Sequence, residues 1–107
     1  MSQPRGEILY FEGCPNHEGA LALVERIAAE LRVEPEVDLV EVPDLDAAAG
    51  LRFLGSPTVR VNGRDVEPGA SERREFVISC RVYQTEQGFS GQPAEAWIRD
   101  ALATART

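Results

Sequence analysis

A change of hydrophobic pattern around Cys14 constrains the fold of this chain more than any other feature. Upstream, residues 7–13 (EILYFEG) place apolar side chains on both faces, as in a central β-strand that is covered on both sides. Downstream, apolar residues recur at helical spacing over residues 17–32, and charged residues take the opposite face. A buried strand that leads directly into an amphipathic helix favours an α/β fold.

The rest of the chain continues this alternation of strand and helix patterns. We expect, in chain order, a strand at 36–42, a short helix from Asp44 to near Gly55, a strand at 58–61 that ends at the turn Asn62-Gly63, an exposed loop at 64–75, a strand at 76–83 and a C-terminal helix from Pro93. Strands joined by a helix are parallel and hairpin strands are antiparallel. The order strand-helix-strand-helix-strand-strand-helix therefore predicts a mixed four-stranded sheet flanked by helices.

Length and charge limit the classes of function. The 107 residues suffice for one domain with a single core. A net charge of -7 argues against nucleic acid and against an anionic membrane surface as partners, because both would repel the chain. The sequence shows neither a membrane span nor a signal-peptide pattern, so we expect a cytoplasmic protein. Its two cysteines are too few for a disulfide scaffold and are either buried or reactive thiols.

Cys14 is the first candidate for a reactive group. Pro15 is favoured at the first position of a helix, which predicts Cys14 as the N-cap of the helix that follows. Its sulfur would then face the free N–H groups of Asn16 and His17 and the positive end of the helix dipole, which favour the nucleophilic thiolate. The alternative is that Cys14 only caps the helix and packs under a loop.

His17 stands three residues after Cys14, where a Cys-x-x-Cys motif would carry its second cysteine. It could tune the thiol through its charge or a proton, or it could be a solvated residue of the first helical turn. A structural zinc site is not expected, because it needs about four ligands and only Cys80 remains as a second thiol. Soft ions that accept two thiolates, such as Hg(II) or Cu(I), stay open, with Cys14 and Cys80 as ligands.

Together, the strand-to-helix junction at Cys14 and the motif GSPT at 55–58 resemble the thioredoxin-like superfamily. The resemblance covers residues 7–102, implies a single domain over 1–107 and implies a cis peptide bond before Pro57, against the reactive sulfur. It also implies no cofactor, and a backbone at this turn that pairs with extended peptide or thiol substrates. The residues that it places at the substrate are Pro15, Asn16, Ser56, Pro57 and Thr58.

More narrowly, the segments YFEGCPN, GSPT and SCRVY resemble a group of small bacterial thioredoxin-like proteins of unsettled function. Some of these proteins carry labels connected with mercury or organomercurials.

Cys80 is the second candidate thiol. In the expected topology the strand at 76–83 returns toward the end of the sheet that holds Cys14, so Cys80 could resolve a mixed disulfide. Alternatively, Cys80 is a core residue that alternates with Ile78 and Val82. Two further residues, Arg81 and Tyr83, would lie on the other face of that strand and either pack on the C-terminal helix or line a pocket.

Three hypotheses of function follow. In the leading one, the Cys14 thiolate attacks a thiol-reactive substrate, which is a disulfide, a glutathione adduct or an electrophile, and the protein is a thiol-disulfide oxidoreductase or thiol-transfer protein. In the second, Cys14 and Cys80 bind a soft metal or an organomercurial. In the third, a thioredoxin-like fold without chemistry binds a protein partner through its groove or the 64–75 loop. The sequence does not indicate an oligomeric state.

Overall fold

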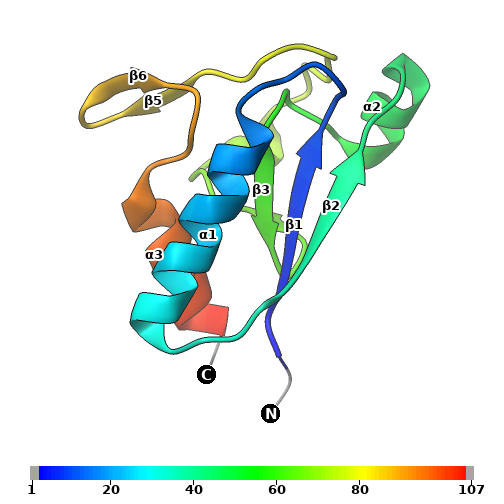
Figure 1. Cartoon of the computed structure of the whole chain (residues 1–107). Helices are drawn as coiled ribbons and strands as arrows, with labels where there is room; N and C mark the ends of the chain where they lie inside the picture. The colour runs from blue at the N-terminus through cyan, green and yellow to red at the C-terminus, as the bar shows by residue number, and fades with distance from the viewer. Residues whose placement is uncertain (1–2, 106–107) are drawn as a thin grey trace.

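The computed structural model describes residues 3–105, and its secondary structure follows the predicted order through the first hairpin (Figure 1). In chain order the elements are β1 (Arg5–Tyr10), α1 (His17–Leu31), β2 (Glu36–Glu41), α2 (Leu45–Leu51), β3 (Thr58–Val61), β4 (Arg64–Asp65), the short 3-10 helix η1 (Ala70–Glu72), β5 (Tyr83–Thr85), β6 (Gly88–Ser90) and α3 (Glu95–Ala105).

The predicted mixed sheet of four strands is confirmed, with the strand order β2-β1-β3-β4. β1 pairs with β2 in parallel and with β3 in antiparallel orientation, and β3 and β4 form an antiparallel hairpin. β1 is therefore a central strand. Its consecutive residues Ile8 and Leu9 point to opposite faces of the sheet, and both are buried. The central position of β1 explains why the segment 7–13 has apolar residues on both faces.

Helices cover both faces of the sheet (Figure 1). α1 and α3 pack against each other on one face, where Ile27 of α1 and Ile98 of α3 join Ile8 in one buried cluster. The short helix α2 covers the other face, where Ala48 and Leu9 share a second buried cluster. Fully burying one such Ile or Leu side chain contributes about 1.5–3 kcal/mol, so these two clusters fix the layers of the fold.

The helix α2 begins where the sequence predicts and ends earlier. The Asp44 carboxylate accepts a hydrogen bond from the Ala47 N–H at 2.8 Å and is the N-cap. Arg52 then adopts a left-handed conformation with φ 56°, and its N–H bonds to the carbonyls of the last turn. The helix therefore ends at Leu51 rather than near Gly55.

The predicted strand at 76–83 is wrong. The fourth strand of the sheet is β4, which follows directly after Asn62-Gly63, and both turn residues have the positive φ of a tight hairpin, 52° and 82°. β4 ends at Asp65, and Pro68, three residues further on, has no N–H to donate to a ladder. The predicted loop at 64–75 thus contains a strand, β4, as well as η1.

The segment 76–82 forms no strand, and its strand-type pairing is one parallel bridge between Ser56 and Cys80. Cys80 and Val82 are exposed whereas Arg81 and Tyr83 are buried, so the alternative in which Cys80 is a core residue is wrong. A second small hairpin, β5–β6, follows this segment and was not predicted. The Tyr83 ring lies 6.2 Å from the ring of Trp97 in α3, so of the two alternatives for this residue the structure has the packing on the C-terminal helix.

None of the helices within residues 3–105 is both long enough and apolar enough to cross a membrane.

Candidate functional site

Cys14 lies in the connection between β1 and α1, and the prediction that it is the helix N-cap is wrong. The helix begins at His17 with Asn16 as its N-cap, and the Asn16 carbonyl accepts a hydrogen bond from the Ala20 N–H at 3.1 Å. Pro15 and Asn16 form a turn in front of the helix, which places Cys14 two residues before the cap. The Cys14 N–H instead donates to the Phe11 carbonyl at 3.2 Å.

The Cys14 side chain faces the turn before β3. The residue is 3% exposed, and its Sγ donates a hydrogen bond to the carbonyl oxygen of Ser56 at 3.6 Å. The Ser56–Pro57 peptide bond is cis, as the resemblance implied. The Thr58 hydroxyl donates to the Gly55 carbonyl at 2.6 Å and ties the two ends of the turn together. The Cys14 sulfur thus contacts the main chain of this turn at Ser56.

The same turn holds Cys80. The Ser56 N–H donates to the Ser79 carbonyl at 2.8 Å, and the Arg81 N–H donates to the Ser56 carbonyl at 2.8 Å. Cys80, between these two bonds, keeps an exposed side chain. The structure therefore brings both cysteines next to one residue, Ser56.

The two thiols also interact with each other. The pKa of the Cys80 thiol is raised by partial desolvation, by the negative charge of Cys14 and by a hydrogen bond with the Cys14 side chain. Cys80 therefore holds its proton more tightly than an ordinary cysteine does. This interaction connects the two thiols of the site.

His17 contacts the main chain of Cys14. Its Nδ1 lies 2.9 Å from the Cys14 carbonyl oxygen, and because a carbonyl only accepts, this nitrogen carries the hydrogen. The ring also stacks on Tyr10 with 4.2 Å between centroids and 13° between planes. These contacts hold the Cys14 backbone in place, and neither of them involves the Cys14 sulfur.

The other predicted substrate residues differ in exposure. Pro15 is exposed, whereas the side chains of Pro57 and Thr58 are buried. Asn16 is half-buried, and its carbonyl accepts a hydrogen bond from the Gln92 side chain at 2.8 Å. Of this set, Pro15 and Asn16 are the side chains that a molecule approaching from solvent can meet.

Sequence reasoning missed a buried ion-pair network beside Cys80. The Arg81 side chain is 1% exposed and bonds to Asp65 at 2.8 Å and to Glu67 at 2.6 Å. It also donates to the Thr58 hydroxyl at 3.1 Å and lies over the Tyr83 ring. The two acidic residues at alternate positions just after the predicted turn were the available signal.

Tyr83 continues this network to the turn before β3. Its hydroxyl donates to the Pro57 carbonyl, and burial raises the pKa of this hydroxyl, which keeps the donor proton in place. Arg81 therefore bonds to Thr58 and Tyr83 bonds to Pro57, and these are the two residues that follow Ser56. The network therefore stabilises the turn at residues 55–58, which both cysteines contact.

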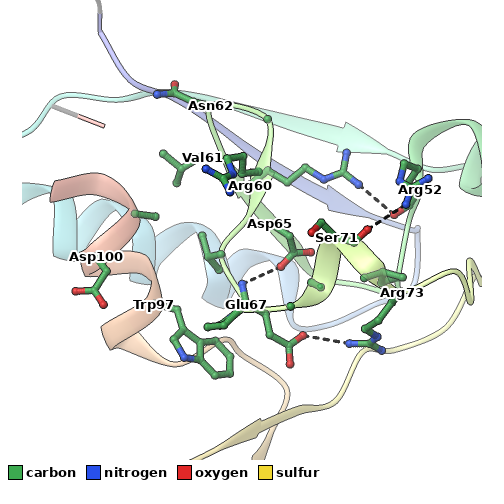
Figure 2. A pocket seen from close by; sticks show the side chains of 18 of the residues that line it. Arg52, Arg60, Val61, Asn62, Asp65, Glu67, Ser71, Arg73, Trp97 and Asp100 are labelled. Atoms are coloured by element: carbon green, nitrogen blue, oxygen red, sulfur yellow. Dashed lines mark hydrogen bonds and ion pairs between the residues drawn. The ribbon is translucent and has the colours of Figure 1, made fainter. Parts of the chain in front are cut away.

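A cavity of about 860 Å³ lies beside the β3–β4 hairpin, η1 and α3, and neither cysteine lines it (Figure 2). Two of its guanidinium groups bond to main-chain carbonyls: Arg60 donates to the Arg52 carbonyl at 3.1 Å, and Arg52 donates to the Ser71 carbonyl at 3.2 Å. Asp65 and Glu67 form part of its wall. The cavity therefore adjoins the Arg81 network but is separate from the thiol pair.

Neither a comparison with models of protein families nor a search of curated proteins found a match to this chain. Within residues 3–105, no three side chains of His, Cys, Asp or Glu gather in a way that could hold a metal ion.

Proposed function

We propose that the protein is a thioredoxin-like thiol-disulfide oxidoreductase with Cys14 and Cys80 as its redox pair. The observation that carries the proposal is that both cysteines lie at Ser56: the Cys14 Sγ donates to its carbonyl oxygen, and Cys80 pairs with it in a parallel bridge. The strand order β2-β1-β3-β4, with Cys14 between β1 and α1 and opposite the turn before β3, supports the thioredoxin-like assignment.

Cys14 is the nucleophile of the pair. Its thiolate attacks one sulfur of a disulfide RSSR, which forms a Cys14–SR mixed disulfide and releases RS⁻, and RS⁻ then takes up a proton. Cys80 then loses its proton and attacks the Cys14 sulfur, which releases the second RS⁻ and leaves a Cys14–Cys80 disulfide. The two protein thiols are oxidised, and RSSR is reduced to two RSH. His17 contributes by holding the Cys14 carbonyl, and so the backbone that carries the sulfur.

The test treats the reduced protein with a small disulfide and identifies the products by mass spectrometry. The native protein should form the internal Cys14–Cys80 disulfide and release two thiols per chain. Cys80→Ser should stop at a mixed disulfide on Cys14, and Cys14→Ser should lose most of the reaction. Absence of an internal disulfide would contradict the proposal. Full activity of Cys14→Ser in cells would favour a protein-binding adaptor without thiol chemistry instead.

A second candidate function is the binding of a soft ion that prefers two thiolates, such as Hg(II). The observation that favours it is the exposure of Cys80 next to the Cys14 sulfur, because an incoming ion can reach one thiol and then the other. The native protein should bind one Hg(II) tightly, and either Cys→Ser variant should bind it far more weakly. Equal binding by the native protein and both variants would exclude this function.

A further inference from the structure

Both backbone hydrogen-bonding groups of Ser56 are already used. Its N–H donates to the Ser79 carbonyl and its carbonyl accepts from the Arg81 N–H, each at 2.8 Å. A polypeptide substrate that adds to a sheet as an extra strand needs such groups to be free. Next to the Cys14 sulfur, residues 79–81 of the protein itself make the hydrogen bonds with Ser56 that such a substrate would make.

The residues 79–81 lie tightly against the turn. A Cβ atom placed on Gly55 would come within 2.9 Å of the Arg81 Cβ and 3.1 Å of the Ser79 carbonyl oxygen. Gly55 also has a φ of 118°, a conformation that favours glycine. There is therefore no room for a second strand between the turn and the residues 79–81.

Arg81 anchors these residues. Its guanidinium is buried and paired with both Asp65 and Glu67, so moving the segment away from Ser56 would separate a buried cation from two carboxylates. Cys14 itself is 3% exposed. A substrate must therefore reach a nearly covered sulfur past a fixed segment.

We propose that residues 79–81 occupy the position beside Ser56 that an extended polypeptide substrate would take, so that the thiol pair reduces disulfides of low molecular weight. The inference rests on the proposed oxidoreductase function and adds its substrate class. A small RSSR oxidises the Cys14 and Cys80 thiols to their internal disulfide and leaves as two RSH, so no other oxidant or reductant is needed for one turnover.

The experiment compares single turnovers of the reduced protein with hydroxyethyl disulfide and with insulin as a polypeptide disulfide. We expect reduction of the small disulfide and a rate with insulin at least ten-fold lower. Asp65→Asn and Glu67→Gln loosen the anchor of Arg81, so the ratio of the insulin rate to the small-disulfide rate should rise. Arg99→Gln, which removes an ion pair between α3 and α1, is the matched control and should keep the native ratio.

A second measurement does not depend on thiol chemistry. Because residues 79–81 stay on the turn, the amide hydrogens of Ser56 and Arg81 should exchange with solvent far more slowly than that of Glu86, in the exposed β5–β6 turn. Rapid exchange of both amides, or equal rates with the two disulfides, would overturn this inference alone. Failure to reduce either disulfide would overturn the proposed function, and this inference with it.

Discussion

At the scale of single residues, the two thiols have different environments although they share Ser56 as a neighbour. Cys14 is buried and donates to the Ser56 carbonyl, whereas Cys80 is exposed and its pKa is raised. A raised pKa means that less Cys80 thiolate is present at neutral pH than for an ordinary cysteine. Exposure alone therefore does not make Cys80 the more reactive thiol, because the thiolate is the nucleophile.

Replacing Cys14 should make Cys80 react faster. Cys14→Ser removes the negative charge and the thiolate acceptor that help to raise the pKa of Cys80, and only desolvation remains. The fraction of Cys80 thiolate at neutral pH should increase, and the pH profile of its alkylation by iodoacetamide should move to lower pH. Mass spectrometry of the labelled peptide measures the rate at each pH.

Cys14→Ala is the matched control, since it removes the charge without introducing a hydroxyl. Both variants should shift the Cys80 profile in the same direction. An unchanged profile in both would show that Cys14 has no influence on Cys80, and the proposed redox pair would lose its main support.

At the scale of secondary-structure elements, local patterns predicted the parts of the fold that local physics determines. The apolar spacing of α1, the N-cap at Asp44 and the turn Asn62-Gly63 need only neighbouring residues, and all three are confirmed. The segment 76–83 has the alternation of a strand, but β4 already occupies the position beside β3. Its conformation depends on tertiary contacts that spacing does not encode.

In the candidate site, too, local patterns predict some features and tertiary contacts determine the others. The position of Cys14 after a strand was predictable, and the resemblance placed it against the turn at Ser56. The approach of Cys80 stayed open, and the strand on which that expectation rested is wrong. The face that Cys80 presents was not, because it is set by the burial of Arg81, and that burial needs Asp65 and Glu67 from another element. An arginine in a strand pattern gives no local sign that two carboxylates will meet it.

The contact between α1 and α3 carries a prediction about pH. Glu30 of α1 bonds to Arg99 of α3 and to Arg26, and these hydrogen bonds lower the pKa of Glu30 below its ordinary value of 4.5. A carboxyl with a lowered pKa in the folded state stabilises the fold above its unfolded pKa. That contribution is lost as pH falls through the folded pKa.

The urea midpoint of the native protein should therefore fall on acidification through the range below pH 4.5. Glu30→Gln, which cannot titrate, should lose less stability over the same range. The difference should be small and should shrink in high salt, because all of these side chains are exposed. Glu25→Gln on the same helix serves as control, and a control that behaves like Glu30→Gln would contradict the assignment.

At the scale of the whole molecule, a Cys14–Cys80 disulfide would connect two distant parts of the chain. Four of the helices and strands that build both layers of the fold, α1, β2, α2 and β3, lie between the two cysteines in sequence, as does the hairpin strand β4. Closing so long a loop removes conformations from the unfolded chain and leaves the folded chain with contacts it already has at Ser56. Oxidation should therefore stabilise the fold.

We expect the oxidised protein to be about 2–4 kcal/mol more stable than the reduced protein, and urea unfolding of the two forms measures the difference. Cys80→Ser should abolish it. By a thermodynamic cycle, a disulfide that stabilises the fold is stabilised by the fold to the same extent. Its reduction potential in the folded protein should be lower than in the unfolded chain by about 40–90 mV. An oxidised form that is less stable than the reduced one would mean that the disulfide pulls Cys80 away from Ser56, and the residues 79–81 would then leave the turn during the reaction.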